Sequence, residues 1–472
     1  MEKSSGIRLP ARAGAWYVAS SALIKLCGMA ATPYFTRVMS PEEYGTYSLY
    51  MSWVAILSVL MTLGLGGSAI YRGMQKFDSQ GDKLTSAALG LSLCSVAAFS
   101  AVALLFFDRL KDLISLPGHL IVILFTQIAL DSVLALYMAR CRYRYGYRLV
   151  IGINAGSALT ALLLSAILAR LLEPTATMRA LSLLSATAIF ALPIAFLVFF
   201  KGKCLFSPKI WGFLARFNLP LLPHLLASSV MMNLDRVLIR HITGDGVALA
   251  GFSVAHSLGA GVGFISSGLG SALNPWIMRK IAQNRQDKVA EVGLKLTCLV
   301  ALGSMAVLTL APEILSILAP KNYSSALPSV YPITVSSAVS FIGTVTATAL
   351  IRAERTGSLS LCSLVGAAVN AGVSLILLPI SFNGAAVAHF AAALASLTVG
   401  IILTRRLPGK SVVKVIPSAA IITAATFLSY ILYALRGDLV PRLGILAVIC
   451  IVGAMCLFKL KDDVIEKDAL KA

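Results

Sequence analysis

Fourteen apolar stretches, each about 20 residues long, run through this 472-residue chain. An α-helix of about 20 residues crosses a hydrocarbon core of roughly 30 Å, and helices satisfy their own backbone hydrogen bonds there. The chain is therefore expected to be an all-α integral membrane protein. The expected spans lie near residues 15–36, 46–70, 84–107, 116–139, 148–169, 180–200, 213–235, 247–275, 291–311, 327–350, 358–379, 384–404, 415–435 and 442–460.

The basic residues between these stretches alternate from gap to gap. The two terminal segments and every second gap between them together hold 28 of the 40 lysines and arginines. The other seven gaps hold 10. Short loops rich in Lys and Arg stay in the cytoplasm. The pattern predicts that both termini are cytoplasmic and that the number of spans is even.

The composition argues against a soluble binding protein. The chain is 58% hydrophobic and only 13% charged, and topology together with anionic lipid headgroups accounts for most of its +20 formal charge. No nucleic-acid partner is expected. The eight cysteines show no disulfide or metal-ligand spacing, so neither a metal site nor a cofactor is predicted.

The gaps predicted to lie outside the cell are only about 5 to 17 residues long. A membrane glycosyltransferase or polysaccharide polymerase generally needs a sizeable external loop or domain beside catalytic carboxylates. The short gaps argue against that class. No catalytic residue is assigned, and the chain is not expected to be an enzyme.

The expected helices form two weakly similar halves, residues 1–205 and 206–410, followed by an accessory pair in 411–472. Ser40-Pro41-Glu42-Glu43 precedes Tyr47-Ser48, and Thr243-Gly244-Asp245-Gly246 precedes Phe252-Ser253, at an offset of 205. Asn154-Ala155-Gly156 and Asn370-Ala371-Gly372 match at an offset of 216. Because each half holds six helices, an even number, the repeats are predicted to be parallel, with substrate between them.

These features resemble the polysaccharide flippases of the multidrug, oligosaccharidyl-lipid, polysaccharide (MOP) exporter superfamily. The resemblance covers about residues 1–405. Its carrying features are Lys25, the turn at 40–48, the run Asn233-Leu234-Asp235-Arg236-Val237-Leu238-Ile239, and Gly384-Ala385-Ala386-Val387-Ala388. The turn at 243–252 departs from the Gly-Pro-Glu-Glu-like turn that family members more often keep.

The resemblance implies a V-shaped pair of six-helix lobes plus two C-terminal helices in the bacterial inner membrane. It implies transport of an undecaprenyl-diphosphate-linked glycan to the outer leaflet by alternating access, for a surface polysaccharide such as the O-antigen of lipopolysaccharide. The implied partners are that glycan, membrane lipids, a polysaccharide polymerase with other assembly proteins, and H⁺ or Na⁺. A cation-coupled multidrug exporter of the same superfamily is the alternative, although such exporters typically have 12 helices and an acidic cavity.

Two charged residues stand at matching depth inside expected spans. A charge near the bilayer centre costs about 2.5–3.5 kcal/mol, so it needs a partner, water or a function. Lys25 and Asp131 both lie about 12–14 Å from the cytoplasmic helix ends, at 1.5 Å per residue. They are expected to form an ion pair, either as a structural pair or with Lys25 binding the substrate diphosphate and Asp131 neutralising it when the site is empty.

Further candidates lie near the outer end of the seventh helix and in the eighth. Arg236, beside Asp235, can hold the lipid headgroup or pair with Glu42 or Glu43 when the external side is closed. The alternative is that Asp235 and Arg236 lie at the membrane interface and extend their charged groups into water. His256 is a candidate proton relay or a hydrogen-bonded packing residue.

The remaining candidates are helix-shaping or polar groups. Pro220 and Pro223 remove backbone donors and predict a bend in the seventh helix. Arg140, within the basic and aromatic run 140–148, is expected to anchor the interface or to gather anionic lipid-linked substrate. Asn154 and Asn370 are candidate polar contacts between lobes or ordinary links between helices.

Overall fold

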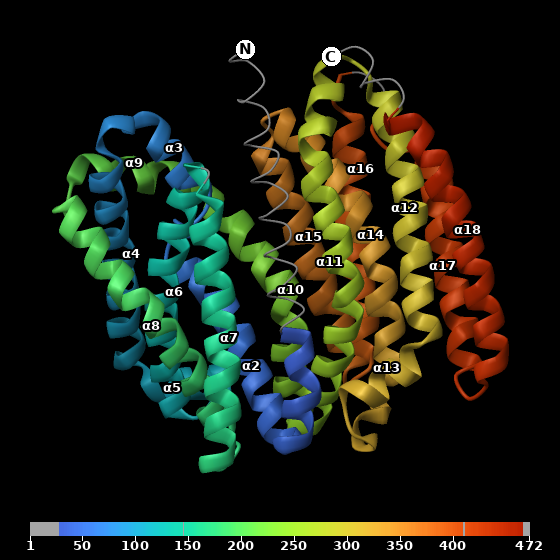
Figure 1. Cartoon of the computed structure of the whole chain (residues 1–472), viewed down its shortest axis with the longest axis horizontal. Coiled ribbons are helices and arrows are strands. Elements are labelled where there is room, and N and C mark those ends of the chain that lie inside the picture. The colour runs from blue at the N-terminus through green and yellow to red at the C-terminus, as the bar shows by residue number, and fades with distance from the viewer. Residues whose placement is uncertain (1–27, 145, 409–410, 466–472) are drawn as a thin grey trace. The chain divides into compact units, whose positions relative to one another are not determined.

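A computed structural model describes residues 28–144, 146–408 and 411–465 of the chain (Figure 1). These residues form helices and short connections, and no strand occurs among them. The expected all-α class is confirmed. Contacts divide the chain into two compact units, residues 1–249 and 250–472.

The first unit opens with helical residues 28–38 and ends in the first turn of α11. Its helices are α2 (Pro41–Met61), α3 (Ser68–Lys76), η1 (Asp78–Gln80), α4 (Gly81–Leu105), α5 (Phe107–Ile114), α6 (Gly118–Tyr143), α7 (Tyr147–Leu171), α8 (Ala176–Gly202), α9 (Pro208–Asn218), η2 (Leu219–Leu221) and α10 (Leu222–Thr243).

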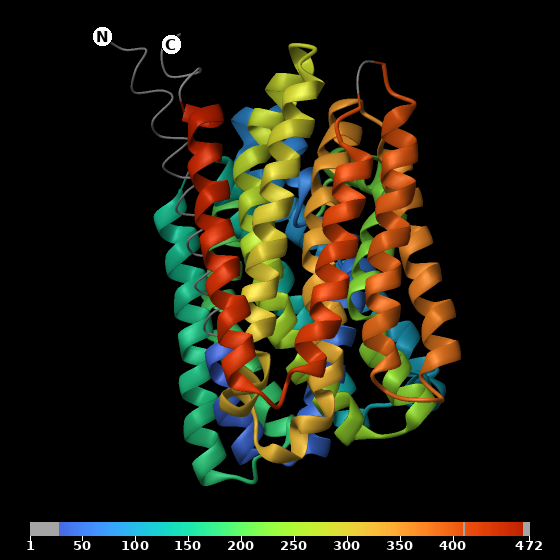
Figure 2. The same ribbon diagram turned by 90° about the vertical axis from the view of Figure 1, so that its right-hand side faces the viewer.

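The second unit contains most of α11 (Gly246–Ala282) and the helices that follow. In this unit α17 and α18 pack on α12, and α17 also packs on α14 (Figure 2). The further helices are α12 (Gln286–Thr309), α13 (Ala311–Leu318), η3 (Lys321–Ala326), α14 (Leu327–Arg352), α15 (Thr356–Leu377), α16 (Gly384–Arg405), α17 (Val415–Ala434) and α18 (Leu439–Ile465).

Twelve of the described helices are long and apolar enough to cross a membrane, and they match twelve of the fourteen expected spans. The protein is therefore a multi-pass membrane protein. Of the other two spans, the one at 15–36 lies mostly outside the described residues. The one at 213–235 is divided into α9, η2 and α10, and α10 carries three charged residues, Asp235, Arg236 and Arg240.

The order of elements repeats along the chain. The helix pairs α2/α11, α4/α12, α6/α14, α7/α15 and α8/α16 begin at offsets of 205 to 209 residues, and the eight-residue helices α5 and α13 also correspond. The same pairs pack within each unit: α4 on α6, α6 on α8 and α7 on α8 in the first, and α12 on α14, α14 on α16 and α15 on α16 in the second. This correspondence agrees with the repeat expected from the short motifs, and the parallel orientation of the two halves stays a prediction.

The repeat differs where α11 is continuous and its counterpart is broken into α2 and α3. Leu63 and Gly64 both have positive φ, 53° and 61°, and no helix continues through two such residues. Buried Asn218 donates its side-chain N–H to the Leu63 carbonyl. A Cβ at Gly64 would lie 2.7 Å from Leu225 Cδ1. The break after α2 therefore packs directly against the segment in which α9 ends and η2 and α10 begin. This is the segment where Pro220 and Pro223 were expected to bend the chain.

A buried arginine fixes the last helix to the second unit. Arg442 in α18 is 3% exposed and binds Glu313 of α13 with two hydrogen bonds, Nη1 to Oε2 at 2.8 Å and Nη2 to Oε1 at 2.6 Å. Its Nη1 also donates to the Thr309 carbonyl at 2.7 Å. Two parallel, charge-assisted bonds give the pair both strength and a fixed orientation.

This pair predicts a pH-dependent contribution to stability. The hydrogen bonds from Arg442 hold the pKa of the Glu313 carboxyl below its usual range. The contribution is therefore complete above the carboxyl pKa of the unfolded chain and is lost as the pH falls through the lower folded pKa. Glu313→Gln is expected to lower the melting temperature in detergent by several degrees at pH 7 and to have less effect under acid.

A matched control is Glu291→Gln, because Glu291 forms only a half-exposed pair with Lys295 one turn away on α12. This substitution is expected to change the melting temperature little. Equal melting temperatures for wild type and Glu313→Gln at pH 7 would contradict the anchoring role of the pair.

Candidate functional site

The first turn of α2 begins at a capping sequence. Ser40 accepts a hydrogen bond from the Glu43 backbone N–H at 3.3 Å, and Pro41 occupies the first helical position. Glu42 and Glu43 follow in the first turn, where the helix dipole favours negative charge. α2 thus starts five residues before the apolar stretch at 46–70, and it presents two adjacent carboxylates.

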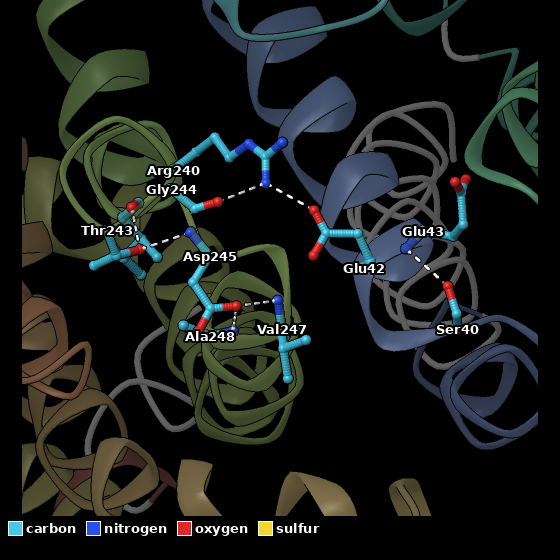
Figure 3. Close-up of polar contacts among 10 residues, drawn as sticks. Ser40, Glu42, Glu43, Arg240, Thr243, Gly244, Asp245, Val247 and Ala248 are labelled. Carbon is cyan, nitrogen blue, oxygen red and sulfur yellow. Dashed lines mark hydrogen bonds and ion pairs between the residues drawn. The ribbon is translucent and has the colours of Figure 1, made fainter.

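Glu42 binds the end of α10 (Figure 3). Its Oε1 lies 2.8 Å from Nη1 of Arg240, and the same Nη1 donates to the Gly244 carbonyl at 3.1 Å. Gly244 ends α10 with φ +66°, a conformation that glycine adopts without strain. The side chains are partly accessible, 51% for Glu42 and 26% for Arg240, so the pair is not locked in the interior.

The start of α11 lies beside the same carboxylate. Asp245 caps α11 by accepting from the N–H groups of Val247 at 2.7 Å and Ala248 at 3.1 Å (Figure 3). A Cβ at Gly246 would overlap the Glu42 carboxylate, so only glycine leaves room for this approach. The two motifs related by an offset of 205 residues are therefore both helix caps, Ser40 for α2 and Asp245 for α11.

Glu43 binds a different helix. Its Oε2 accepts from the backbone N–H of Ala176, the first residue of α8, at 2.6 Å. Thr175 caps the same helix by accepting from the Met178 N–H at 3.2 Å. Neighbouring glutamates of α2 thus connect it to α8 on one side and to α10 and the start of α11 on the other.

Arg179, in the first turn of α8, lies among aromatic rings. Its guanidinium carbon is 3.8 Å from the ring centre of Phe35, 4.2 Å from Tyr47 and 5.6 Å from Tyr44. Its Nη1 is buried and has no hydrogen-bond partner among the described residues. A cation over ring faces is stabilised by their negative potential. Arg179 was not among the candidates chosen from the sequence, although Tyr44 and Tyr47, three residues apart on α2, were an available signal.

Polar contacts join α2 to α9 and α10 along their length. They are the Glu42–Arg240 pair, the Ser229 hydroxyl donating to the Ala55 carbonyl at 2.8 Å, and the Asn218 amide donating to the Leu63 carbonyl. The residue numbers rise from Glu42 through Ala55 to Leu63, while those of their partners fall from Arg240 through Ser229 to Asn218. This is the order expected of two antiparallel segments. We call these three contacts the α2–α10 contact series.

Asp131 belongs to a polar group between α6 and α8. Gln127 donates its amide N–H groups to Asp131 Oδ1 and to Thr187 Oγ1, both at 3.0 Å. Gln127 is 1% exposed and Thr187 2% exposed. Lys25 lies outside the described residues, so its pairing with Asp131 stays a prediction.

Glu42 pairs with Arg240. Arg240 lies one turn further along α10 than Arg236, next to the glycine that ends the helix, where its side chain can bridge to the first turn of α2. Asp235 is buried at 1% exposed, and Arg236 is half-buried. The expected pairing of this end of α10 with Glu42 therefore occurs, but through a different arginine.

Three further candidates, His256, Asn370 and Arg140, have partners that the sequence did not identify. His256 of α11 lies edge to face with His389 of α16, with ring centres 5.6 Å apart, and sequence reasoning missed His389. Asn370 is buried and accepts from Ser374 of its own helix at 3.2 Å. Asn154 is half-buried in α7, the counterpart of the Asn370 helix. Arg140 of α6 forms an ion pair with Asp82 of α4.

Similar structures share this fold over most of their length. A structure titled lipid II flippase MurJ in an inward closed conformation is 13% identical, with a TM-score of 0.71, covering 93% of this chain and 98% of that one. An outward-facing multidrug resistance MATE family transporter of the MOP superfamily is 16% identical, with a TM-score of 0.60, covering 88% and 96%. A MOP superfamily transporter from Pyrococcus furiosus is 15% identical, with a TM-score of 0.58, again covering 88% and 96%.

No curated protein sequence matches the chain. Residues 11–281, more than half of it, match the family model described as polysaccharide biosynthesis protein. The chain therefore belongs to the polysaccharide biosynthesis protein family and has the fold of the MOP superfamily transporters.

Proposed function

We propose that this protein carries a polyprenyl-diphosphate-linked oligosaccharide from the cytoplasmic to the outer leaflet of the bacterial inner membrane, for synthesis of a surface polysaccharide. Membership of a polysaccharide biosynthesis family and the fold shared with a lipid II flippase support this substrate class. An O-antigen precursor is the specific substrate we favour. Transport without a chemical reaction on the glycan is part of the proposal.

The α2–α10 contact series is the observation that carries the proposed mechanism. By the chain repeat, α2 belongs to the first six-helix lobe (1–205) and α10 to the second (206–410), yet α10 packs against α2 from end to end. Alternating access requires such a contact to close one side and to separate when that side opens. We assign the Glu42–Arg240 end to the outer side, from the predicted cytoplasmic termini.

The strength of these contacts suits a gate. An exposed ion pair contributes only about 0.2–1 kcal/mol, so thermal motion can break it, whereas a deeply buried pair would resist opening. The interruption at η2 gives α10 freedom to move relative to α9, because the 3₁₀ turn and two prolines weaken the continuous helix there. Glu43, bound to α8, holds α2 to its own lobe while Arg240 is released.

The anionic diphosphate needs a cation on its path. We propose Lys25 for this contact and Asp131 as the group that neutralises it between cycles or binds the coupling H⁺ or Na⁺. Gln127 supports this role, since it donates to the Asp131 carboxylate while its amide is also bonded to Thr187. Asp235 and the His256–His389 pair are further candidates for coupling. A cation-coupled drug exporter is the second candidate function, favoured by the similar MATE structures.

Breaking the outer pair is predicted to favour the open state. In a background without native cysteines, Ser229→Cys is labelled from outside with a membrane-impermeant maleimide. Adding Glu42→Gln or Arg240→Gln is expected to raise the labelling rate about 1.5- to 5-fold, since the pair contributes about 0.2–1 kcal/mol.

Asp108→Asn is the matched control. It removes an exposed pair with Lys111 within α5 that does not join α2 to α10. Unchanged labelling with Glu42→Gln, or the same increase with Asp108→Asn, would rule out a gate at this position.

Removing the charge of Asp131 is predicted to stop export while the fold persists. Asp131→Asn keeps the shape and an acceptor for Gln127, so the melting temperature is expected to stay within a few degrees of wild type. Surface polysaccharide is expected to fall at least tenfold and lipid-linked intermediate to accumulate in the inner leaflet. Thr187→Val disturbs the same polar group without changing charge and is expected to export normally. Normal export by the Asp131→Asn variant would show that the charge of Asp131 is not needed for transport.

A further inference from the structure

A cavity of about 170 Å³ lies in the first unit, where α6 ends and α7 begins, against the last turn of α8. One buried water needs roughly 10–15 Å³ on the same scale, so the cavity accommodates a group of several non-hydrogen atoms. Its polar lining comes from Arg140, Arg144, Lys201 and Tyr137, and its apolar lining includes Leu149 and Leu197.

The cavity carries an excess of positive charge. Arg140, Arg144 and Lys201 line it, and Asp82 pairs with Arg140, whose side chain is only 12% exposed. Among the described side chains, neither Arg144 nor Lys201 forms an ion pair, and both are exposed. The pair with Asp82 fixes Arg140, while the two other cations remain available to an anion.

The backbone leaves room for one of these cations. A Cβ at Gly81, the first residue of α4, would lie 3.0 Å from Arg144 Nη2, so the absence of a side chain there lets the guanidinium pack over the start of α4. Arg144, at the end of α6, and Lys201, at the end of α8, both line the cavity.

The apolar lining distinguishes the expected ligand from a free anion. Leu149, which lines the cavity beside Leu197, is 56% exposed, so the cavity includes an accessible apolar side chain. Arginine and tyrosine residues at the end of a membrane helix typically mark the headgroup level. Cations at that level, beside apolar side chains, match a phosphate with attached hydrocarbon.

We propose that this cavity binds the phosphate headgroup of a membrane lipid, with Arg144 and Lys201 contacting the phosphate oxygens and Arg140 held beside them by Asp82. The source is a resident phospholipid or a polyprenyl diphosphate. The site goes beyond the proposed transport function, and its test measures binding without transport.

The test is native mass spectrometry of the full chain in neutral detergent, titrated separately with phosphatidylglycerol, undecaprenyl diphosphate and inorganic phosphate. Wild type is expected to bind one of the two lipids with saturation. The double variant Arg144→Gln/Lys201→Gln is expected to bind it at least tenfold more weakly, because it loses two charge-assisted contacts. The conservative double variant Arg144→Lys/Lys201→Arg retains both charges and is expected to keep most of the affinity.

Arg148→Gln is the matched control, because Arg148 is an exposed cation at the start of α7 that does not line the cavity. A preference for phosphatidylglycerol identifies a resident phospholipid, and a preference for undecaprenyl diphosphate identifies a docking site for that lipid; either result supports the proposal. Unchanged lipid affinity in Arg144→Gln/Lys201→Gln, equal loss in Arg148→Gln, or inorganic phosphate binding as tightly as lipid would overturn it. Melting temperatures confirm that the variants are folded.

Discussion

Backbone groups inside a hydrocarbon layer must find hydrogen-bond partners within the protein, and this constraint organises the structure wherever a helix begins, ends or breaks. The Leu63 carbonyl after α2 accepts a hydrogen bond from the Asn218 amide, and the Gly244 carbonyl after α10 accepts one from Arg240. The first N–H of α8 donates to Glu43. Asn218 and Glu43 come from other helices than the ends they satisfy, so these two helix ends are also points of attachment.

The same attachments connect fold to transport. The first turn of α2 carries two adjacent carboxylates, one bound to α8 and the other to α10. By the chain repeat, α8 belongs to the same half as α2 and α10 to the next half, so this one turn joins helices of both halves. In the account proposed above, the first bond persists and the second opens. The two partners differ in freedom: Glu43 accepts from a fixed backbone N–H, whereas Glu42 pairs with a long, partly exposed side chain.

Much of the fold was predictable because its signals are local. Apolar length places the spans to within several residues, and proline spacing indicates the interruption at η2. The offset of 205 residues between Ser40 and Asp245 proved to relate two helix caps, since capping depends on a few neighbouring residues. Charge alternation remains the basis for orientation, and Lys25 lies outside the described residues.

The partners within the site were less predictable because they depend on packing between distant helices. The sequence singled out Arg236, and only the position of the α10 end beside α2 brings Arg240 to Glu42. The aromatic surroundings of Arg179 and the meeting of His256 with His389 likewise join segments far apart in the chain.

Movement of a lipid-linked diphosphate between leaflets can be measured with the purified protein reconstituted in vesicles. Proteoliposomes would carry a fluorescent polyprenyl-diphosphate oligosaccharide, and quencher accessibility would report its leaflet. We expect translocation that increases with the amount of protein, persists in Lys25→Arg and is lost in Lys25→Glu. Absence of translocation by the wild-type protein, or equal rates for wild type and Lys25→Glu, would contradict it.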